Sequence, residues 1–224
     1  MPVSRIQNLQ LFSSPIGNVE QNPFYYEALA KDEGYKFIAG IDEAGRGPLA
    51  GPVTAAAVIL PAGNCPDGIK DSKKMTVMER EKLFPLIVDC SVSFAIAVVS
   101  HSFIDKHNIL KATLEAMKQA VLALHITPDF LLIDGNQPVP VNIRQRCIKK
   151  GDSLSKSISA ASILAKVYRD WIMDGYSNQF PVYGFNINKG YGTAYHRNAI
   201  SVFGPCPIHR MTFKGSLKSD KIQD

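Results

Sequence analysis

One predicted helix with no polar face constrains the fold of this chain most. Residues 157–165 read Ser-Ile-Ser-Ala-Ala-Ser-Ile-Leu-Ala, and they open a helix that we predict over residues 157–176. A helix that is apolar all round has to be buried on every side. Because the side chains of its first half are also small, we expect this helix to pack closely against a β-sheet.

Short apolar runs rich in β-branched or aromatic residues predict the strands of that sheet. They are residues 35–41, 53–60, 91–100 and 129–134. A glycine-rich turn between the first two favours an antiparallel pair. Helices are predicted from Thr76, which forms a capping-box pattern with Glu79, to about residue 88, and over most of residues 102–124. These elements predict an α/β or α+β sheet with helices on both faces.

The length of 224 residues suits one domain with a small extension. Residues 1–34 are predicted to form an N-terminal arm with a short helix over residues 23–33. Residues 35–224 are predicted to form the main domain, which ends in a region rich in Gly, Pro, Lys, Arg and His.

Several classes of protein are disfavoured by the sequence. No apolar run reaches the roughly 18 residues that span a bilayer, and no secretion signal is recognisable. The four cysteines lack C-x-x-C spacing, which argues against a zinc site and fits a cytoplasmic protein. A net charge of +5 permits an anionic partner without requiring one.

Four acidic residues are candidates for metal chemistry. Asp42 and Glu43 follow the first predicted strand, Asp134 closes the strand at residues 129–134, and Asp152 follows a basic pair. Acids at strand ends lie where open α/β sheets bind ligands. Gathered carboxylates repel one another unless a hard cation such as Mg²⁺ or Mn²⁺ binds them. Two such ions roughly 4 Å apart can activate a water for phosphodiester cleavage. Alternatively, each Asp is a turn former or a helix cap.

Neighbouring residues of a regular strand point to opposite faces. Asp42 and Glu43 are therefore expected to share a site only if the chain leaves strand geometry there. Gly45-Arg46-Gly47 follows at once, and glycine lets backbone N–H groups approach a ligand closely. The spacing through Gly51 matches neither a dinucleotide-binding nor a P-loop motif. A plain glycine turn is the alternative.

Basic and aromatic residues could contact a nucleic acid. Lys73, in Asp-Ser-Lys-Lys, could position a phosphate backbone, although a solvated surface is the alternative. Asp170 could instead pair with a basic neighbour on its helix. Tyr191, between two glycines, could stack on a sugar or base, or be buried in a tight turn. His196 and His209 have no metal-ligand spacing and are interpreted as structural or surface residues.

Taken together, these motifs resemble ribonuclease HII, the bacterial type 2 ribonuclease H. The resemblance extends over about residues 35–213. It depends on five blocks in order, at residues 39–53, 71–74, 133–136, 151–170, and 189–193 with 207–210. The Gly-Arg-Gly turn matches this family rather than ribonuclease HIII, and the residues before the first strand are too few for the N-terminal domain of ribonuclease HIII.

The resemblance implies a ribonuclease H-like fold, with a mixed five-stranded sheet flanked by helices and a helical C-terminal part. It implies a monomeric endonuclease that cuts the RNA strand of RNA–DNA hybrids and the 5′ side of single ribonucleotides embedded in duplex DNA. The products carry 5′-phosphate and 3′-hydroxyl ends. Two Mn²⁺ or Mg²⁺ ions would serve it, bound by the four matching acids: Asp42, Glu43, Asp134 and Asp152.

The resemblance also assigns recognition of the RNA-to-DNA junction. Gly45, Arg46, Gly47 and Tyr191 match the elements that sense the ribose 2′-hydroxyl and pack on the next sugar. Residues 8–12, Asn-Leu-Gln-Leu-Phe, loosely resemble a bacterial sliding-clamp-binding peptide, with Asn where Gln is usual.

Two other functions stay open on the residues alone. A non-catalytic nucleic-acid-binding module would bind without cleavage and without Mg²⁺ or Mn²⁺. Unneutralised strand-end acids argue against it, because they would repel phosphates. Another nuclease or transposase of the same fold would cut all-DNA duplex, which a 2′-hydroxyl sensor should prevent.

Overall fold

The computed structural model describes residues 22–61, 66–69 and 72–216, without the side chain of Lys73. The predicted arm up to residue 21, including the clamp-like residues 8–12, lies outside the described residues. The predicted short helix is present as α1, Tyr25–Asp32.

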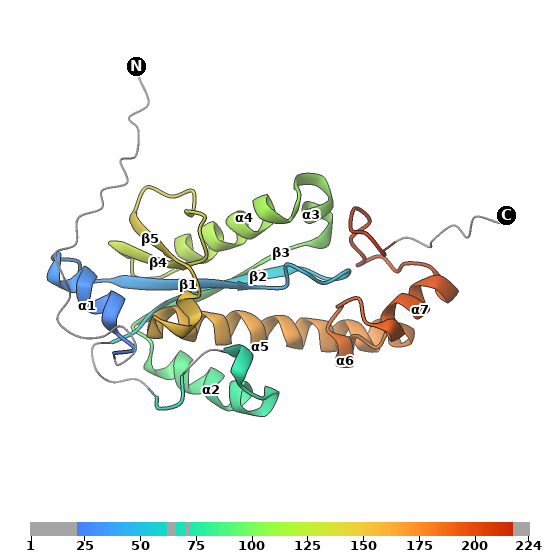
Figure 1. Cartoon of the computed structure of the whole chain (residues 1–224), viewed down its shortest axis with the longest axis horizontal. Coiled ribbons are helices and arrows are strands. Elements are labelled where there is room, and N and C mark those ends of the chain that lie inside the picture. The colour runs from blue at the N-terminus through green and yellow to red at the C-terminus, as the bar shows by residue number, and fades with distance from the viewer. Residues whose placement is uncertain (1–21, 62–65, 70–71, 217–224) are drawn as a thin grey trace, which may run out of the picture.

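A mixed five-stranded sheet forms the centre of the molecule (Figure 1). Its strands are β1 (Ile38–Ala44), β2 (Val53–Ile59), β3 (Ser93–Val99), β4 (Phe130–Asp134) and β5 (Arg144–Ile148), in the order β3-β2-β1-β4-β5. The pairs β1–β2 and β2–β3 are antiparallel, while β1–β4 and β4–β5 are parallel. The predicted antiparallel hairpin and the mixed sheet are therefore confirmed.

Helices cover both faces of the sheet (Figure 1). On one face lie α3 (His101–His107) and α4 (Ile109–Leu122), whose apolar side chains form one core with β1 to β4. On the other lie α2 (Val77–Cys90) and the long α5 (Lys156–Gln179). The Thr76–Glu79 capping box is present at the start of α2.

The small residues of α5 let it pack directly on β1. A Cβ atom added to Gly40 would lie 2.1 Å from the main-chain carbon of Ser157, so only glycine fits there. On the opposite side of α5, Leu83 and Ile87 of α2 complete its burial. Burial of the first half of α5 on all sides, predicted from its composition, is confirmed.

Two regions differ from the elements predicted from residue patterns. The helical stretch after residue 102 is broken at Asn108, which has a φ of 73° and caps α4 through a bond from the Lys111 N–H. The C-terminal region, although rich in Gly and Pro, is helical, as the family resemblance implied. It contains α6 (Phe185–Asn188) and α7 (Ala194–Phe203), which pack with the end of α5 in a separate apolar cluster.

Three short 3₁₀ turns complete the described elements: η1 (Ser72–Lys74), η2 (Gly151–Ser153) and η3 (Pro181–Tyr183). The last of these connects α5 to α6. The first two are bonded to α5, through Ser72 and Ser162 and through Asp152 and Ser159, and they carry residues that the sequence singled out. Among the described residues, no helix is both long and apolar enough to cross a bilayer.

Candidate active site

Asp42 and Asp134 lie side by side on two parallel strands, at the point where β4 ends. The register pairs Ile41 of β1 with Ile133 of β4, so the next residue of each strand is an aspartate. β4 ends at Asp134, whereas β1 continues to Ala44. The predicted meeting of these two acids at the end of the sheet is therefore present in the structure.

The Asp42 carboxyl group is in an environment that disfavours its charge. Its residue is only 4% exposed, and the pKa is raised well above its usual value, first by burial and then by the charges of Glu43 and Asp134. Hydrogen bonds from the Ser162 hydroxyl and the Glu43 N–H act in the opposite direction. For Asp42, both influences that lower the pKa are hydrogen bonds, and they are outweighed by burial and the two neighbouring carboxylates.

A second hydroxyl extends the contact made by Ser162. The Ser72 and Ser162 oxygens are 2.7 Å apart, and both residues are buried. Either hydroxyl can be the donor of this bond. The turn η1 of the Asp-Ser-Lys-Lys motif is thereby connected to Asp42 through α5.

The chain keeps strand geometry at Asp42 and Glu43, so the condition stated for these two acids to share a site is not met by the backbone. β1 pairs with β2 through Asp42–Ala56 and Glu43–Ala55, so the two acids point to opposite faces of the sheet. They still interact electrostatically. Because β4 ends at Asp134, β1 extends past its neighbour through Glu43 to Ala44.

Asp152 reaches the same end of the sheet from η2. The Gly151 N–H donates to Asp134 Oδ1 at 2.7 Å and so fixes η2 against the end of β4. Asp152 itself is 3% exposed, and its carbonyl accepts the Ser159 hydroxyl of α5 at 2.7 Å. The structure therefore brings Asp152 into the neighbourhood of Asp134.

The Gly-Arg-Gly turn follows β1, and a buried arginine bonds its main-chain carbonyls. Arg210 donates to the carbonyl oxygens of Gly45 (2.6 Å), Arg46 (2.9 Å), Gly51 (3.0 Å) and Pro52 (3.1 Å). The Arg46 side chain, in contrast, is half exposed and forms an ion pair with Glu43 at 3.2 Å.

A second buried arginine holds the other side of the same turn. Arg169 of α5 donates to the carbonyls of Pro52 (2.9 Å), Lys189 (3.0 Å) and Ala50 (3.2 Å). Gly45 has a φ of 97°, and a Cβ atom there would lie 2.0 Å from Arg169 Nε. Glycine is thus required at this position for both its backbone conformation and the packing of the guanidinium.

Tyr191 lies beside this turn on a neighbouring loop. The Leu49 N–H donates to the Gly190 carbonyl at 2.8 Å, which joins the two segments. A Cβ atom on Gly47 would make ordinary contact with the Tyr191 ring, and the tyrosine is 44% exposed. Of the two readings from sequence, the exposed ring is the one observed.

His196 and His209 support the Tyr191 loop from inside, as the structural interpretation predicted. His196 Nδ1 is 2.9 Å from the Tyr191 carbonyl, and its Nε2 is 3.0 Å from His209 Nε2. His209 Nδ1 accepts the Cys206 N–H at 2.9 Å. Burial lowers the pKa of both rings, that of His209 to about 4.

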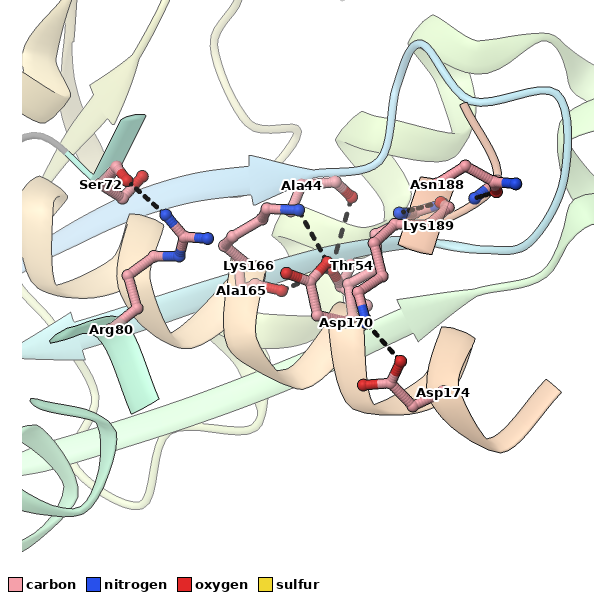
Figure 2. A network of polar contacts seen from close by, with 12 residues as sticks. Ala44, Thr54, Ser72, Arg80, Ala165, Lys166, Asp170, Asp174, Asn188 and Lys189 are labelled. Carbon is pink, nitrogen blue, oxygen red and sulfur yellow. Dashed lines mark hydrogen bonds and ion pairs between the residues drawn. The ribbon is translucent and has the colours of Figure 1, made fainter. Parts of the chain in front are cut away.

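Two further basic residues pair with acids of α5 (Figure 2). Lys166 pairs with Asp170 at 2.7 Å, as the structural alternative for Asp170 predicted, and Lys189 pairs with Asp174. Arg80 donates to the carbonyls of Ser72 and Met75 and so fixes η1. The side chain of Lys73, the predicted phosphate contact, lies outside the described part of the chain.

The donor set suits a hard divalent cation. Asp42, Glu43 and Asp134 offer carboxylate oxygens, which Mg²⁺ and Mn²⁺ prefer, and the mutual repulsion of these groups would be relieved by such an ion. Among the described residues, no group of three or more His, Cys, Asp or Glu side chains is arranged to hold a metal as it stands. Binding would therefore need the acids to draw together.

Three residues at this site were not predicted to act there. Ser162, Arg169 and Arg210 contact the acids or the turn, yet each comes from a segment distant in sequence. Residue patterns do not reveal which carbonyls a buried arginine meets.

Comparisons with known proteins agree with this geometry. The family model described as Ribonuclease HII matches residues 39–216. A protein named Ribonuclease HII from Geobacter metallireducens is 54% identical over 196 residues, which covers 88% of this chain and 92% of the relative.

Two solved structures share the fold. The ribonuclease H2 of Pyrococcus horikoshii OT3 has a TM-score of 0.70 at 27% identity, covering 81% of this chain and 95% of the other. The RNase HII of Archaeoglobus fulgidus, solved in a complex with PCNA, has a TM-score of 0.66 at 26% identity, covering 80% and 96%.

Proposed function

The chain belongs to the ribonuclease HII family, and from this premise we propose that it cuts 5′ of single ribonucleotides embedded in duplex DNA, as well as the RNA strand of RNA–DNA hybrids. Membership makes it an endoribonuclease of the ribonuclease H type. Cleavage leaves 5′-phosphate and 3′-hydroxyl ends. The observation that carries the proposal is the Asp42–Asp134 pair at the sheet end, directly beside the Gly-Arg-Gly turn.

The four acids have different tasks in this proposal. Asp42, Glu43 and Asp134 hold Mg²⁺ or Mn²⁺, and Asp152 helps hold a second ion or aids product release. Two such ions would activate a water and stabilise the leaving oxygen. The Ser162 hydroxyl orients the Asp42 carboxylate, and the Gly151 N–H orients that of Asp134. No Ser, Cys or His nucleophile is needed.

The Gly-Arg-Gly turn and the Tyr191 loop select the substrate. Main-chain N–H groups of the turn at Gly45, Arg46 and Gly47 meet the ribose 2′-hydroxyl, the group that separates RNA from DNA. The exposed ring of Tyr191 packs on the sugar of the following deoxynucleotide. Lys73 contacts the phosphate backbone.

The test is cleavage of a duplex that contains one ribonucleotide, assayed with Mg²⁺, with Mn²⁺ and with a chelator. Asp42→Asn should lose nearly all activity, because it removes a charge from the cation-binding set. Asp89→Asn makes the same chemical change at an exposed residue of α2 and should cleave at the wild-type rate. Wild-type cleavage by Asp42→Asn would refute the assignment. Binding without any metal-dependent cleavage would favour the non-catalytic module, and cutting of all-DNA duplex would favour another nuclease.

The remaining proposals concern partners and location. We propose a monomeric, cytoplasmic protein that contacts a sliding clamp through residues 8–12; the complex of the Archaeoglobus fulgidus relative with PCNA supports clamp contact in general and not this segment. A pull-down decides it, since an arm-deleted protein that still binds the clamp equally well would contradict it. Gel filtration at micromolar concentration tests the monomer.

A further inference from the structure

In the part of the chain that the structure describes, two buried guanidinium groups donate hydrogen bonds only to main-chain carbonyls of the Gly-Arg-Gly turn and the neighbouring tyrosine loop. Arg169 and Arg210 are both 0% exposed. Arg169 donates to three carbonyls and Arg210 to four, and within the described residues neither lies within ion-pair distance of a carboxylate. Burying a charge that lacks a counter-ion is unfavourable for folding. Burial accordingly lowers the pKa of both groups, to about 10 and about 9.

The bonds from Arg210 fix the direction of two peptide groups. In a trans peptide the C=O and the following N–H point in opposite directions, and the described chain contains no cis peptide. With the Gly45 and Arg46 carbonyls turned inward to Arg210, the N–H groups of Arg46 and Gly47 face away from the interior. Neither N–H has an acceptor among the described residues.

Arg169 connects this turn to the tyrosine loop. It bonds the Pro52 and Ala50 carbonyls on one side and the Lys189 carbonyl on the other, two residues before Tyr191. One rigid, planar group thus sets the distance between the two segments.

We infer that Arg169 and Arg210 are positioning residues for ribose recognition: they hold the turn so that the Arg46 and Gly47 N–H groups are aimed at the 2′-oxygen, and they hold Tyr191 at the matching distance. This inference rests on the proposed function and deepens it. Neither arginine touches the substrate. Lysine cannot replace either one, because a single ammonium group cannot bond three or four separated carbonyls at once.

The test combines changes in the protein with a change in the sugar. In the Asp42→Asn background, where the duplex stays intact, affinity is measured with Mg²⁺ for duplexes holding one ribonucleotide or one 2′-fluoro nucleotide. Fluorine is a poor acceptor, so the ribonucleotide should bind about tenfold more tightly, as expected for hydrogen bonds to one hydroxyl. Adding Arg210→Lys or Arg169→Lys should reduce this ratio toward one.

A control separates positioning from loss of stability. Met117→Ala removes buried side-chain volume from α4, on the opposite face of the sheet from α5, and should leave the ratio near tenfold wherever the protein is folded. An unchanged ratio in a folded lysine variant overturns the inference. The inference is also overturned if Asp42→Asn alone binds both duplexes equally while the wild-type protein cleaves hybrids. That result would leave the proposed activity intact.

The wild-type chain supplies a second measurement in case neither lysine variant folds. The amide signals of Arg46 and Gly47 should shift in NMR spectra when the ribonucleotide duplex is added without divalent metal, and shift less with the 2′-fluoro duplex. Equal shifts with both duplexes would overturn the inference. Failure of the wild-type protein to cleave any ribonucleotide-containing duplex would instead refute the proposed function.

Discussion

The buried histidine pair should make this protein lose stability in mild acid. His196 and His209 are 0% and 1% exposed and share one hydrogen bond, Nε2 to Nε2 at 3.0 Å. His196 Nδ1 donates to the Tyr191 carbonyl, so its Nε2 has to accept from His209. His209 Nδ1 in turn accepts the Cys206 N–H. Each ring therefore carries one proton, and an added proton would break a bond.

The direction and the size of this loss of stability follow from the pKa of His209. Burial is the largest cause that lowers it, from 6.5 to about 4, and the charges of His196 and His101 lower it further. Because the folded pKa is below the unfolded one, the unfolded chain takes up the proton first as the pH falls. Stability is complete above about pH 6.5 and is lost toward pH 4. Between pH 7 and pH 5 the loss from this one group is about 2 kcal/mol.

Urea denaturation at pH 7 and pH 5 measures this loss. His209→Gln keeps an N–H donor near the Nε2 position but cannot titrate, so its loss of stability should be smaller than that of the wild type by about 2 kcal/mol. His125→Gln makes the same change at an exposed histidine and should behave as the wild type. Equal losses in the wild type and His209→Gln would refute the reasoning.

Three further substitutions test the packing and the site. Gly40→Ala should destabilise the fold by about 3 kcal/mol or more in denaturant unfolding, because its Cβ atom would collide with the Ser157 main chain; a value below about 1 kcal/mol would contradict direct strand–helix contact. Gly175 is on α5, the helix that carries Ser157, and a Cβ atom added there would have no neighbour within 4 Å. Gly175→Ala should therefore stabilise the fold by about 0.5–1 kcal/mol. Ser162→Ala removes the hydroxyl that donates to Asp42 and should slow cleavage of the ribonucleotide duplex about tenfold at nearly unchanged thermal stability. A wild-type rate would show that this bond does not orient the carboxylate.

Strong local patterns explain which elements could be predicted. The capping box at Thr76 and the apolar run of β2 depend on residues close together in sequence. Such patterns can be recognised without knowing the tertiary contacts. β5 was not found from its residues, because Arg144–Ile148 is an edge strand with polar side chains and little apolar alternation. Only the family resemblance implied a fifth strand.

The end of β1 shows how tertiary contacts override a local reading. Gly45 and two adjacent acids predicted that the strand stops at Ile41. Instead β2 pairs with β1 through Ala44, and Thr54 donates to the Ala44 carbonyl and to that of Ala165 on α5 (Figure 2). The hydrogen bonds of a partner strand and the contact with α5 outweigh the local tendency to turn.

Some residues of the candidate site could also be predicted from the sequence, and others could not. The acids Asp42 and Asp134 and the exposed Tyr191 could be proposed from their positions after strands or between glycines. The hydroxyls and guanidiniums that orient them could not, because Ser162 is 120 positions from Asp42 and Arg210 is 165 positions from Gly45. Their partners are main-chain carbonyls or carboxylates, which leave no complementary signal in the sequence.

The sequence by itself determined that a small, apolar helix had to be buried against a sheet and that acids would collect at one end of it. Side-chain size and hydrophobicity act at every position of α5 whatever its neighbours are. Tertiary structure alone decided that α5 would also deliver Ser162 to the acids and Arg169 to the turn, on the faces that the sheet and the C-terminal cluster present to it. Hydrogen bonds are directional and short, so which groups they join depends on the final positions of segments that are distant in sequence.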